Sequence, residues 1–502
     1  MFLWLTSPVS NTLTFRTSLT FFDVSPPDPN NGSRTFIQVP ATGVLHVEQG
    51  QAHNTVLEAQ PSTGGSLVYY MTTVNDVYAF LRTGVVAQDP NFPMPANFPT
   101  TQADLSQITS FAASKGITFP DPNALAIMVK SSWVEAASLP NLSNYITMTA
   151  TVPTYDMSDP TKKKWVQNGT KTVQLALVGM HVVGSATGHP EAIWATFEHE
   201  DNAPRGQYQY VDNNSTTVTV NRGTTKNWVF NSTPPLGPFN TQKMTFTNSA
   251  PPTIDATTSN TISPSNTIRW KAFGAAFSGL PNPLVSSPAD SNTQVISIND
   301  SVNSQLLFSG VADVRSRYVM TGATWTIGGA APTTFFQKSG NIVGTSVLSN
   351  STMETDTQGS GTSLSNNEDG CLTCHRTNNF SVSHDFGNLQ PLTTFITNPG
   401  YTLGSFPGNV FVALPSPGTL AFVPDLISVI PLNGFTRSVE FSATSLPTGV
   451  SAIFSKSGSP RATRLMLVVS PQAPVGVSNV EITGTSGNLR ATTTLSLNIS
   501  RK

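Results

Sequence analysis

Short apolar runs separated by turn residues recur along the whole chain, and this pattern limits its fold more than any other feature. In the run 493–499, Leu495, Leu497 and Ile499 alternate with Thr, Ser and Asn, as on a strand with one buried face. The turns are supplied by 38 prolines and 36 glycines, and charged residues make up only 11% of the chain. Since 502 residues exceed one ordinary domain, we predict a mainly β, multidomain fold.

Changes in sequence texture divide the chain into four segments. We predict a β-rich N-terminal extension at 1–60 and a β-rich core domain with minor helices at 61–345. A short cysteine-containing segment follows at 346–398. The segment 399–502 is predicted to be an immunoglobulin-like β-sandwich, because its short strands are regularly spaced and joined by Pro- and Gly-containing turns. Its predicted strands include Val439–Ala443, Leu465–Val469, Val477–Thr483 and Thr493–Ile499.

Two helices are expected near the start of the core domain. The first has Val74, Val77, Tyr78 and Leu81 at helical spacing, with Gly84 as its C-cap. The second carries an apolar stripe, ends at Gly116, and is followed by strands, with a short helix near Asp300. The stripe is Leu105, Ile108, Phe111 and Ala112, and the predicted strands are Ala126–Trp133, Tyr145–Val152, Val173–Val183, Glu191–His199, Thr267–Ala272 and Tyr318–Ile327.

Charge and hydropathy exclude several classes of partner. The net charge is -2 and no basic block is present, so nothing favours nucleic acid as a ligand. No apolar run approaches the ~18 residues of a membrane-spanning helix, so no transmembrane segment is expected. Residues 1–10 lack the basic and apolar regions of a signal peptide, and we expect a truncated or misassigned start.

The two cysteines of the chain lie in one motif, Cys371-x-x-Cys374-His375. This is the spacing of c-type haem attachment. The two thiols can bond the two vinyl groups of one haem, and the adjacent imidazole is then directed at the iron. We predict one covalent haem c on Cys371 and Cys374, with His375 as the proximal iron ligand.

Two other interpretations of the motif stay open. The thiols could hold zinc with His375 or His384, although a structural zinc site needs four ligands, usually from two pairs. They could also form a redox pair or a plain disulfide, but no strand–helix boundary of the usual redox kind is evident here.

The sixth ligand of the iron has two candidates. His384 lies nine residues after His375 and could reach the opposite face of the haem, although a solvated loop histidine is the ordinary interpretation. Met353 could approach from the other side. Met466 is disfavoured, because it falls inside a predicted strand of the sandwich.

Three further histidines, His181, His189 and His199, flank a predicted hairpin whose loop is 184–190. If Val183 pairs with Glu191, then His181 opposes Ile193 and His199 shares that face. A second metal site is one interpretation, and structural histidines are the more common one.

Three stretches resemble bacterial "cytochrome c family proteins", which have a GxHxV and WxTFEHxDNxP core and an NTTMET tail before CxxCH. They are 178–183, 193–204 and 350–355, the last reading Asn-Ser-Thr-Met-Glu-Thr. The resemblance spans roughly 65–390 and implies haem binding on Cys371, Cys374 and His375, but no established reaction. The segment 405–500 is similar to bacterial immunoglobulin-like modules, which implies surface or matrix display.

The expected function is that of a periplasmic or extracellular haem protein in electron transfer, with a redox protein or a small-molecule donor or acceptor as partner. The alternatives are a peroxidase or oxidoreductase with an open iron position, and a secreted binding or adhesion protein. Whether the chain is an enzyme stays open. We expect Cys371–His375 to pack against the N-terminal domain, because few large apolar residues lie near the motif and the sandwich needs its own inward faces.

Overall fold

The structure is a computed structural model of the whole chain. It describes the chain except for residues 10–11, 18–19, 40–42, 48–53, 61–64, 89–91, 93–97, 122, 225, 235–236, 274–287, 308–312, 330–341, 346–347, 349, 356–387, 394–399, 407, 433–434, 457–460 and 502.

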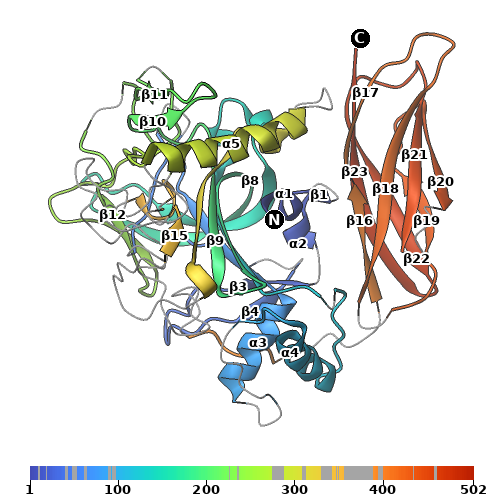
Figure 1. The fold of residues 1–502 in the computed structure, drawn as a ribbon, viewed down its shortest axis with the longest axis horizontal. Coiled ribbons are helices and arrows are strands. Elements are labelled where there is room, and N and C mark those ends of the chain that lie inside the picture. The colour runs from blue at the N-terminus through green and yellow to red at the C-terminus, as the bar shows by residue number, and fades with distance from the viewer. Residues whose placement is uncertain are drawn as a thin grey trace.

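The fold is mainly β and multidomain, as predicted, and one of its sheets curls into a half-barrel (Figure 1). The strands of this large sheet are β3 (Phe21–Val24), β4 (Phe36–Gln38), β5 (Tyr69–Asn75), β6 (Ile127–Glu135), β7 (Thr147–Asp156), β8 (Lys164–Ala186), β9 (His189–His199), β12 (Met244–Thr247), β13 (Thr253–Ala256), β14 (Tyr318–Thr326) and β15 (Ile342–Gly344). Their order is β15-β14-β9-β8-β6-β5-β3-β4, and β7 and β13 pair with β8.

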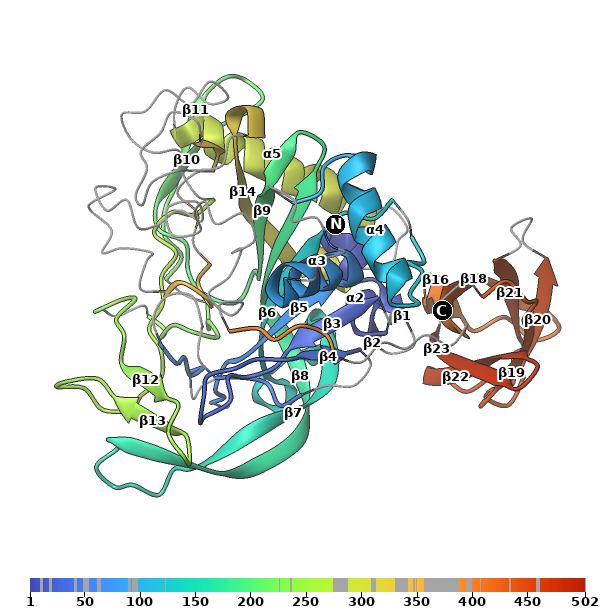
Figure 2. The same cartoon turned by 90° about the horizontal axis from the view of Figure 1, so that it is seen from below.

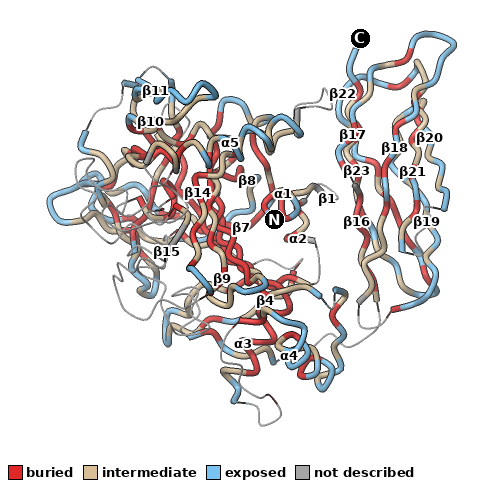
Figure 3. The backbone as a smooth tube through the Cα atoms, viewed as in Figure 1, coloured by how far each residue is buried: buried red, intermediate tan, exposed pale blue. Residues whose placement is uncertain are grey.

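The long strand β8 organises the sheet. Its apolar second half is buried from Leu175 onward and pairs with β6 and β9. Its polar first half is largely exposed and pairs with β7 and β13, and in Figure 2 these strands and β12 extend together away from the rest of the domain. Figure 3 shows buried backbone concentrated where β8, β9 and β14 run together. The sequence of one strand therefore defines both the core and the projecting ribbon.

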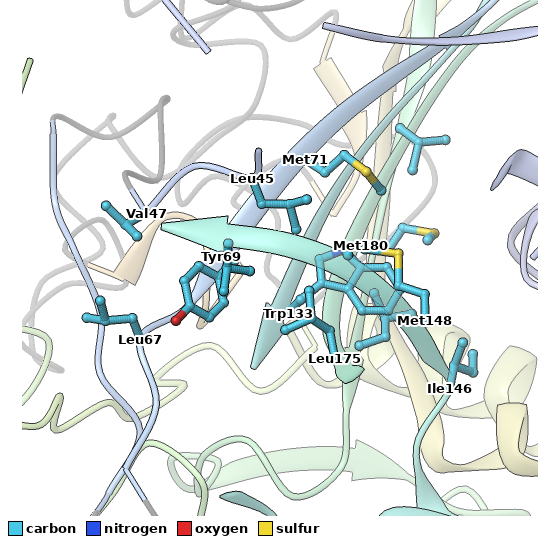
Figure 4. Packing of buried hydrophobic residues seen from close by; sticks show 14 of the residues in the cluster. Leu45, Val47, Leu67, Tyr69, Met71, Trp133, Ile146, Met148, Leu175 and Met180 are labelled. Atoms are coloured by element: carbon cyan, nitrogen blue, oxygen red, sulfur yellow. The ribbon is translucent and has the colours of Figure 1, made fainter. Parts of the chain in front are cut away.

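Both faces of the sheet are covered. One face carries the largest apolar cluster, in which Trp133, Leu175 and Met180 pack together (Figure 4). The other carries helices α3 (Asp76–Ala87) and α4 (Gln102–Ser114), whose aromatic residues pack on β5, β6, β8 and β9. Helix α4 is confirmed as predicted. Its buried residues are the expected stripe, and Thr101 and Asp104 form a capping box at its start.

The prediction for α3 is wrong at both ends. Val74 belongs to β5, and Asn75 caps the helix by accepting a hydrogen bond from the backbone of Tyr78. The helix ends at Gln88, which has a φ of 47°, and not at Gly84. Gly84 lies inside the helix. A glycine is needed there because the ring of Phe92 packs against it, 2.3 Å from where a Cβ would be.

Two other predictions need correction. Residues 267–272 do not form a strand: Arg269 makes one isolated bridge with Arg205 and turns its side chain into the core. The short helix near Asp300 is α5 (Pro288–Leu307), a 20-residue helix. Its apolar stripe is weak in the sequence, and the Asn299 side chain instead bonds the backbone of Met320 in both directions, at 2.8 Å each.

Residues 1–60 share the core of the large sheet. Strands β3 and β4 pair in it, and Phe2, Leu5 and Phe15 lie in its largest apolar cluster. The remaining small elements are α1 (Phe2–Leu5), β1 (Pro8–Val9), β2 (Thr12–Leu13), α2 (Thr14–Thr17), β10 (Tyr208–Val211) and β11 (Thr217–Val220).

The C-terminal segment is a β-sandwich, as predicted. Its sheets have the orders β16-β18-β21-β20 and β17-β23-β22-β19. Leu495, Leu497 and Ile499 point inward and are at most 1% exposed, while Met466 lies half-buried on β21. The bounds are β16 (Gly400–Phe406), β17 (Asn409–Ala413), β18 (Ala421–Leu432), β19 (Glu440–Thr444), β20 (Val450–Lys456), β21 (Ala462–Val469), β22 (Gly476–Ser486) and β23 (Leu489–Ser500). In the described part of the chain, no helix combines the length and the apolar character needed to cross a bilayer.

Candidate functional site

Three side-chain rows cross β5, β6, β8 and β9 on the face that carries the helices. Each row is an in-register set of cross-strand neighbours, and residues two apart on a strand share a face. One row is apolar, and the next two, which we call the polar strip, are mostly polar yet buried. The apolar row is Val74, Met128, Val183 and Trp194, and the polar strip is Thr72, Lys130, His181 and Thr196 followed by Tyr70, Ser132, Gly179 and Glu198.

The segment Asn350–Thr355, which we call the anchor, lies on the polar strip. Asn350, Ser351 and Thr352 have no exposed surface. The Asn350 amide donates to Thr196 Oγ1 at 2.8 Å, and its Oδ1 accepts from the backbone and hydroxyl of Thr352 at 2.8 and 2.7 Å. A turn closes between Asn350 and Glu354, whose backbone N–H donates to Asn350 O at 3.0 Å. Asn350 therefore holds the anchor's turn and binds the sheet at once.

Glu198 binds the anchor through hydrogen bonds to Ser351, and its carboxylate is ion-paired inside the protein. One carboxylate oxygen accepts the backbone N–H of Ser351 at 2.6 Å, and the other accepts the Ser351 hydroxyl. Arg269 forms an ion pair with the same carboxylate, and both side chains are 4% exposed. Burial lowers the pKa of Arg269 to about 9, against the opposing effect of Glu354, so the guanidinium is still charged at neutral pH. A buried charge pair of this kind is costly to break.

The anchor backbone lies close to the second row of the polar strip. The Thr352 hydroxyl lies 2.7 Å from Ser132 Oγ, and the Tyr70 hydroxyl donates to Thr352 O at 2.5 Å. Gly179 follows Ser132 in this row, and a Cβ on it would be 2.5 Å from Thr352 Oγ1 and 2.7 Å from Ser132 Oγ. The anchor can approach the sheet here because Gly179 has no side chain.

Glu354 makes a second charged contact between the anchor and the polar strip. Its Oε1 lies 2.6 Å from His181 Nε2, and its Oε2 accepts the backbone N–H of Asn350 at 2.9 Å. Burial alone would raise the pKa of Glu354. The charge and hydrogen bond of His181, with smaller contributions from Lys130 and the Asn350 backbone, hold that pKa below its usual value. The carboxylate is therefore ionised within the strip.

Met353 points away from the polar contacts of its neighbours. It has no exposed surface and packs in an apolar cluster with Tyr70, Val134, Val178 and Phe230. Its role as a sixth iron ligand stays a prediction, and in this structure the side chain is part of the core.

The chain that follows the cysteine motif also binds the core domain. Arg34 N donates to Asn388 O at 3.1 Å, and Gln390 N donates to Arg34 O at 2.8 Å. Leu389 is 1% exposed in the aromatic cluster of α3 and α4, and Leu392 N donates to Thr83 Oγ1 at 3.1 Å. The candidate site residues Cys371, Cys374, His375 and His384 lie outside the described residues, between these two attachments.

The three histidines of the predicted hairpin have separate partners. The register expected for them is wrong: Val183 pairs with Trp194 and His181 with Thr196, because the turn is only Thr187-Gly188 and a bulge shifts the pairing beyond Gly184. His189 Nδ1 bonds Glu191 at 2.9 Å. Within the described ranges, no group of three or more His, Cys, Asp or Glu side chains could hold a metal ion.

His199 is buried in a fixed neutral form. Its Nε2 bonds Asn144 O at 3.0 Å, its Nδ1 accepts the backbone N–H of Asp201 at 3.2 Å, and its ring stacks on Tyr145. Nε2 therefore carries the proton, because Nδ1 is the acceptor. Burial lowers the pKa of His199 to about 4, despite the opposing charge of Asp201.

Comparisons with known proteins add no family. No family model matches the sequence, and no curated protein sequence matches it. The interpretation of the site therefore depends on its residues and geometry.

The residues that receive the anchor were not predicted from the sequence; they are Tyr70, Lys130, Ser132 and Arg269. One signal was available, because Lys130 and the serines that follow it interrupt the apolar strand Ile127–Glu135. Polar residues on both faces of a strand in the middle of a sheet need a polar partner elsewhere in the chain.

Proposed function

We propose that this chain is an extracytoplasmic c-type haem protein that transfers electrons through one covalently bound haem. The observation that carries the proposal is the motif Cys371-x-x-Cys374-His375, which contains both cysteines of the chain. Its donor set fits the group: two thiols for the two vinyl carbons and one imidazole for the iron.

The structure supports the proposal through the flanks of the motif. The anchor at 350–355 and the attachment at 388–392 both bind the core domain. A haem is a large apolar group, and its exposure to water costs about 25 cal/mol per Å². Attachments on both sides favour a haem that packs on the core domain and not on the sandwich.

The residues have separate roles in this function. Cys371 and Cys374 would hold the macrocycle, and His375 would bind its iron. The bound haem supplies reversible one-electron chemistry at its iron. The electron partner is a redox protein or a small-molecule donor or acceptor, and the immunoglobulin-like sandwich serves display at the cell surface or in the matrix.

Covalent haem retention tests the proposal. The chain is expressed with an export signal in a host that attaches c-type haem, and the denatured protein is stained for haem. We expect retention in the wild type and in His384→Ala, and loss in Cys371→Ala/Cys374→Ala. A denatured wild-type protein without haem would refute the proposal. A high-spin ferric absorption spectrum would instead favour a peroxidase or oxidoreductase with an open iron position.

A further inference from the structure

We propose that residues 350–355 form a protein-only anchor that fixes the haem-bearing segment on the core domain before haem is attached, with Asn350 and Thr352 as positioning residues. The inference rests on the proposed function only for the identity of the group that the anchored segment carries, which is the haem. The anchor itself is defined by contacts between protein groups.

The first argument is the match between the anchor and the polar strip. Both buried rows of the strip contribute to the contact: Thr196 and His181 from one, Ser132 and Glu198 from the other. Buried polar groups in a sheet are costly unless each has a partner. A segment more than 150 residues away supplies these partners, so the strip is built to receive it.

Haem contributes no atom to the network of contacts that holds the anchor. Backbone N–H groups of Ser351 and Thr352 are satisfied by Glu198 and by Asn350, and the hydroxyl of Thr352 by Asn350 and Ser132. Every one of these contacts joins protein to protein. The anchor can therefore form in a chain that carries no haem.

The anchor is the last described part of the chain before the cysteine motif. It ends at Thr355, the last described residue before the motif, and Thr355 is only 3% exposed. The attachment at 388–392 follows on the other side of the motif. The haem-bearing segment thus begins and ends on the same domain, and the anchor determines where it begins.

Hydrogen exchange tests whether the anchor forms without haem. The Cys371→Ala/Cys374→Ala protein is compared with the wild type, and exchange is followed at the amides of 351–354. We expect equal protection in both proteins. Asn350→Ala should speed exchange at these amides by about tenfold or more, the factor equivalent to about 1.4 kcal/mol. Asn231→Ala, which removes a buried amide that donates to Thr267 O at 2.6 Å, is the matched control and should leave them protected.

Thr352→Val keeps the shape of the side chain and removes only the hydroxyl contacts, so it covers the case in which Asn350→Ala does not fold. Protection that depends on the two cysteines, or that survives both anchor variants, would overturn the proposal. The failure of the proposed function is seen separately, as a wild-type protein without haem.

A redox measurement separates positioning from general stability. In the haem-loaded protein, Asn350→Ala should lower the midpoint potential, because a haem that packs less closely is more exposed to water and water favours the more charged ferric state. Asn231→Ala should leave the potential unchanged. Equal potentials in the two variants would assign Asn350 a structural role alone.

Discussion

Replacing Gly179 with alanine should destabilise the core domain by about 2–6 kcal/mol. The new Cβ would lie 2.5 Å from Thr352 Oγ1, 2.7 Å from Ser132 Oγ and 3.1 Å from Asn350 Oδ1. The anchor must then move away from the sheet. Overpacking of this kind costs about 1–3 kcal/mol, and the hydroxyl groups left without a partner cost a further 1–3 kcal/mol or so.

Urea unfolding monitored by tryptophan fluorescence measures this loss. The seven tryptophans all precede residue 346, so the signal reports the core domain without the sandwich. Gly223→Ala is the matched control. Its Cβ would meet only Trp228 at 3.5 Å, an ordinary contact, and its effect should stay within about 0.5 kcal/mol.

A double variant locates the cause. If the clash with Thr352 is responsible, Gly179→Ala/Thr352→Ala should cost less than the sum of the two single changes, because the second substitution removes the obstructing hydroxyl. Additive effects, or a Gly179→Ala protein as stable as Gly223→Ala, would refute the reasoning.

Three further predictions concern the Glu198–Arg269 ion pair, the buried His199 and the C-terminal sandwich. Glu198→Gln leaves the buried guanidinium of Arg269 without its carboxylate and should cost about 3–5 kcal/mol in urea unfolding, whereas Glu200→Gln, at a half-exposed pair, should cost less than about 1 kcal/mol. The unfolded chain binds a proton at His199 near the ordinary pKa of 6.5, and the folded chain does so only near pH 4. The free energy of unfolding should therefore fall by about 3 kcal/mol as the pH drops from 6.5 to 4. His199→Gln should flatten the pH profile of stability between these two values, and an unchanged profile would contradict the assignment. Deleting 399–502 should leave the tryptophan-monitored transition and any haem absorption spectrum unchanged, and a shifted haem spectrum would place the sandwich next to the haem.

The sequence predicted those elements whose structure depends on residues close together in the chain. The stripe of α4 and the alternation of Leu495, Leu497 and Ile499 depend on neighbours in one element, and the structure has them as expected. The predicted end of α3 was wrong because Gly84 was interpreted as a C-cap. The glycine instead leaves room for the ring of Phe92, which comes from a separate loop. The sequence of the helix alone does not show that Phe92 packs against it.

The site was predictable only in part for the same physical reason. The three stretches that carry the family resemblance are the ones that meet in the structure, through Gly179, Glu198 and Asn350. The rest of the polar strip was not predicted, because its partners are remote: Ser132 and Thr352 are separated by 220 residues and Tyr70 and Thr352 by 282. The burial of the charged Lys130 is explained by its electrostatic interaction with the carboxylate of Glu354, which comes from a distant part of the chain.

The attachment of the chain on both sides of the cysteine motif has a consequence for how such a protein can change. In the general treatment of loop closure, doubling the number of residues between two fixed points costs only about 0.6 kcal/mol. Insertions or replacements between Thr355 and Asn388 would therefore leave both attachments and the sheet intact. We therefore expect changes of length or sequence between the two attachments to be tolerated as long as the residues that make the attachments are kept.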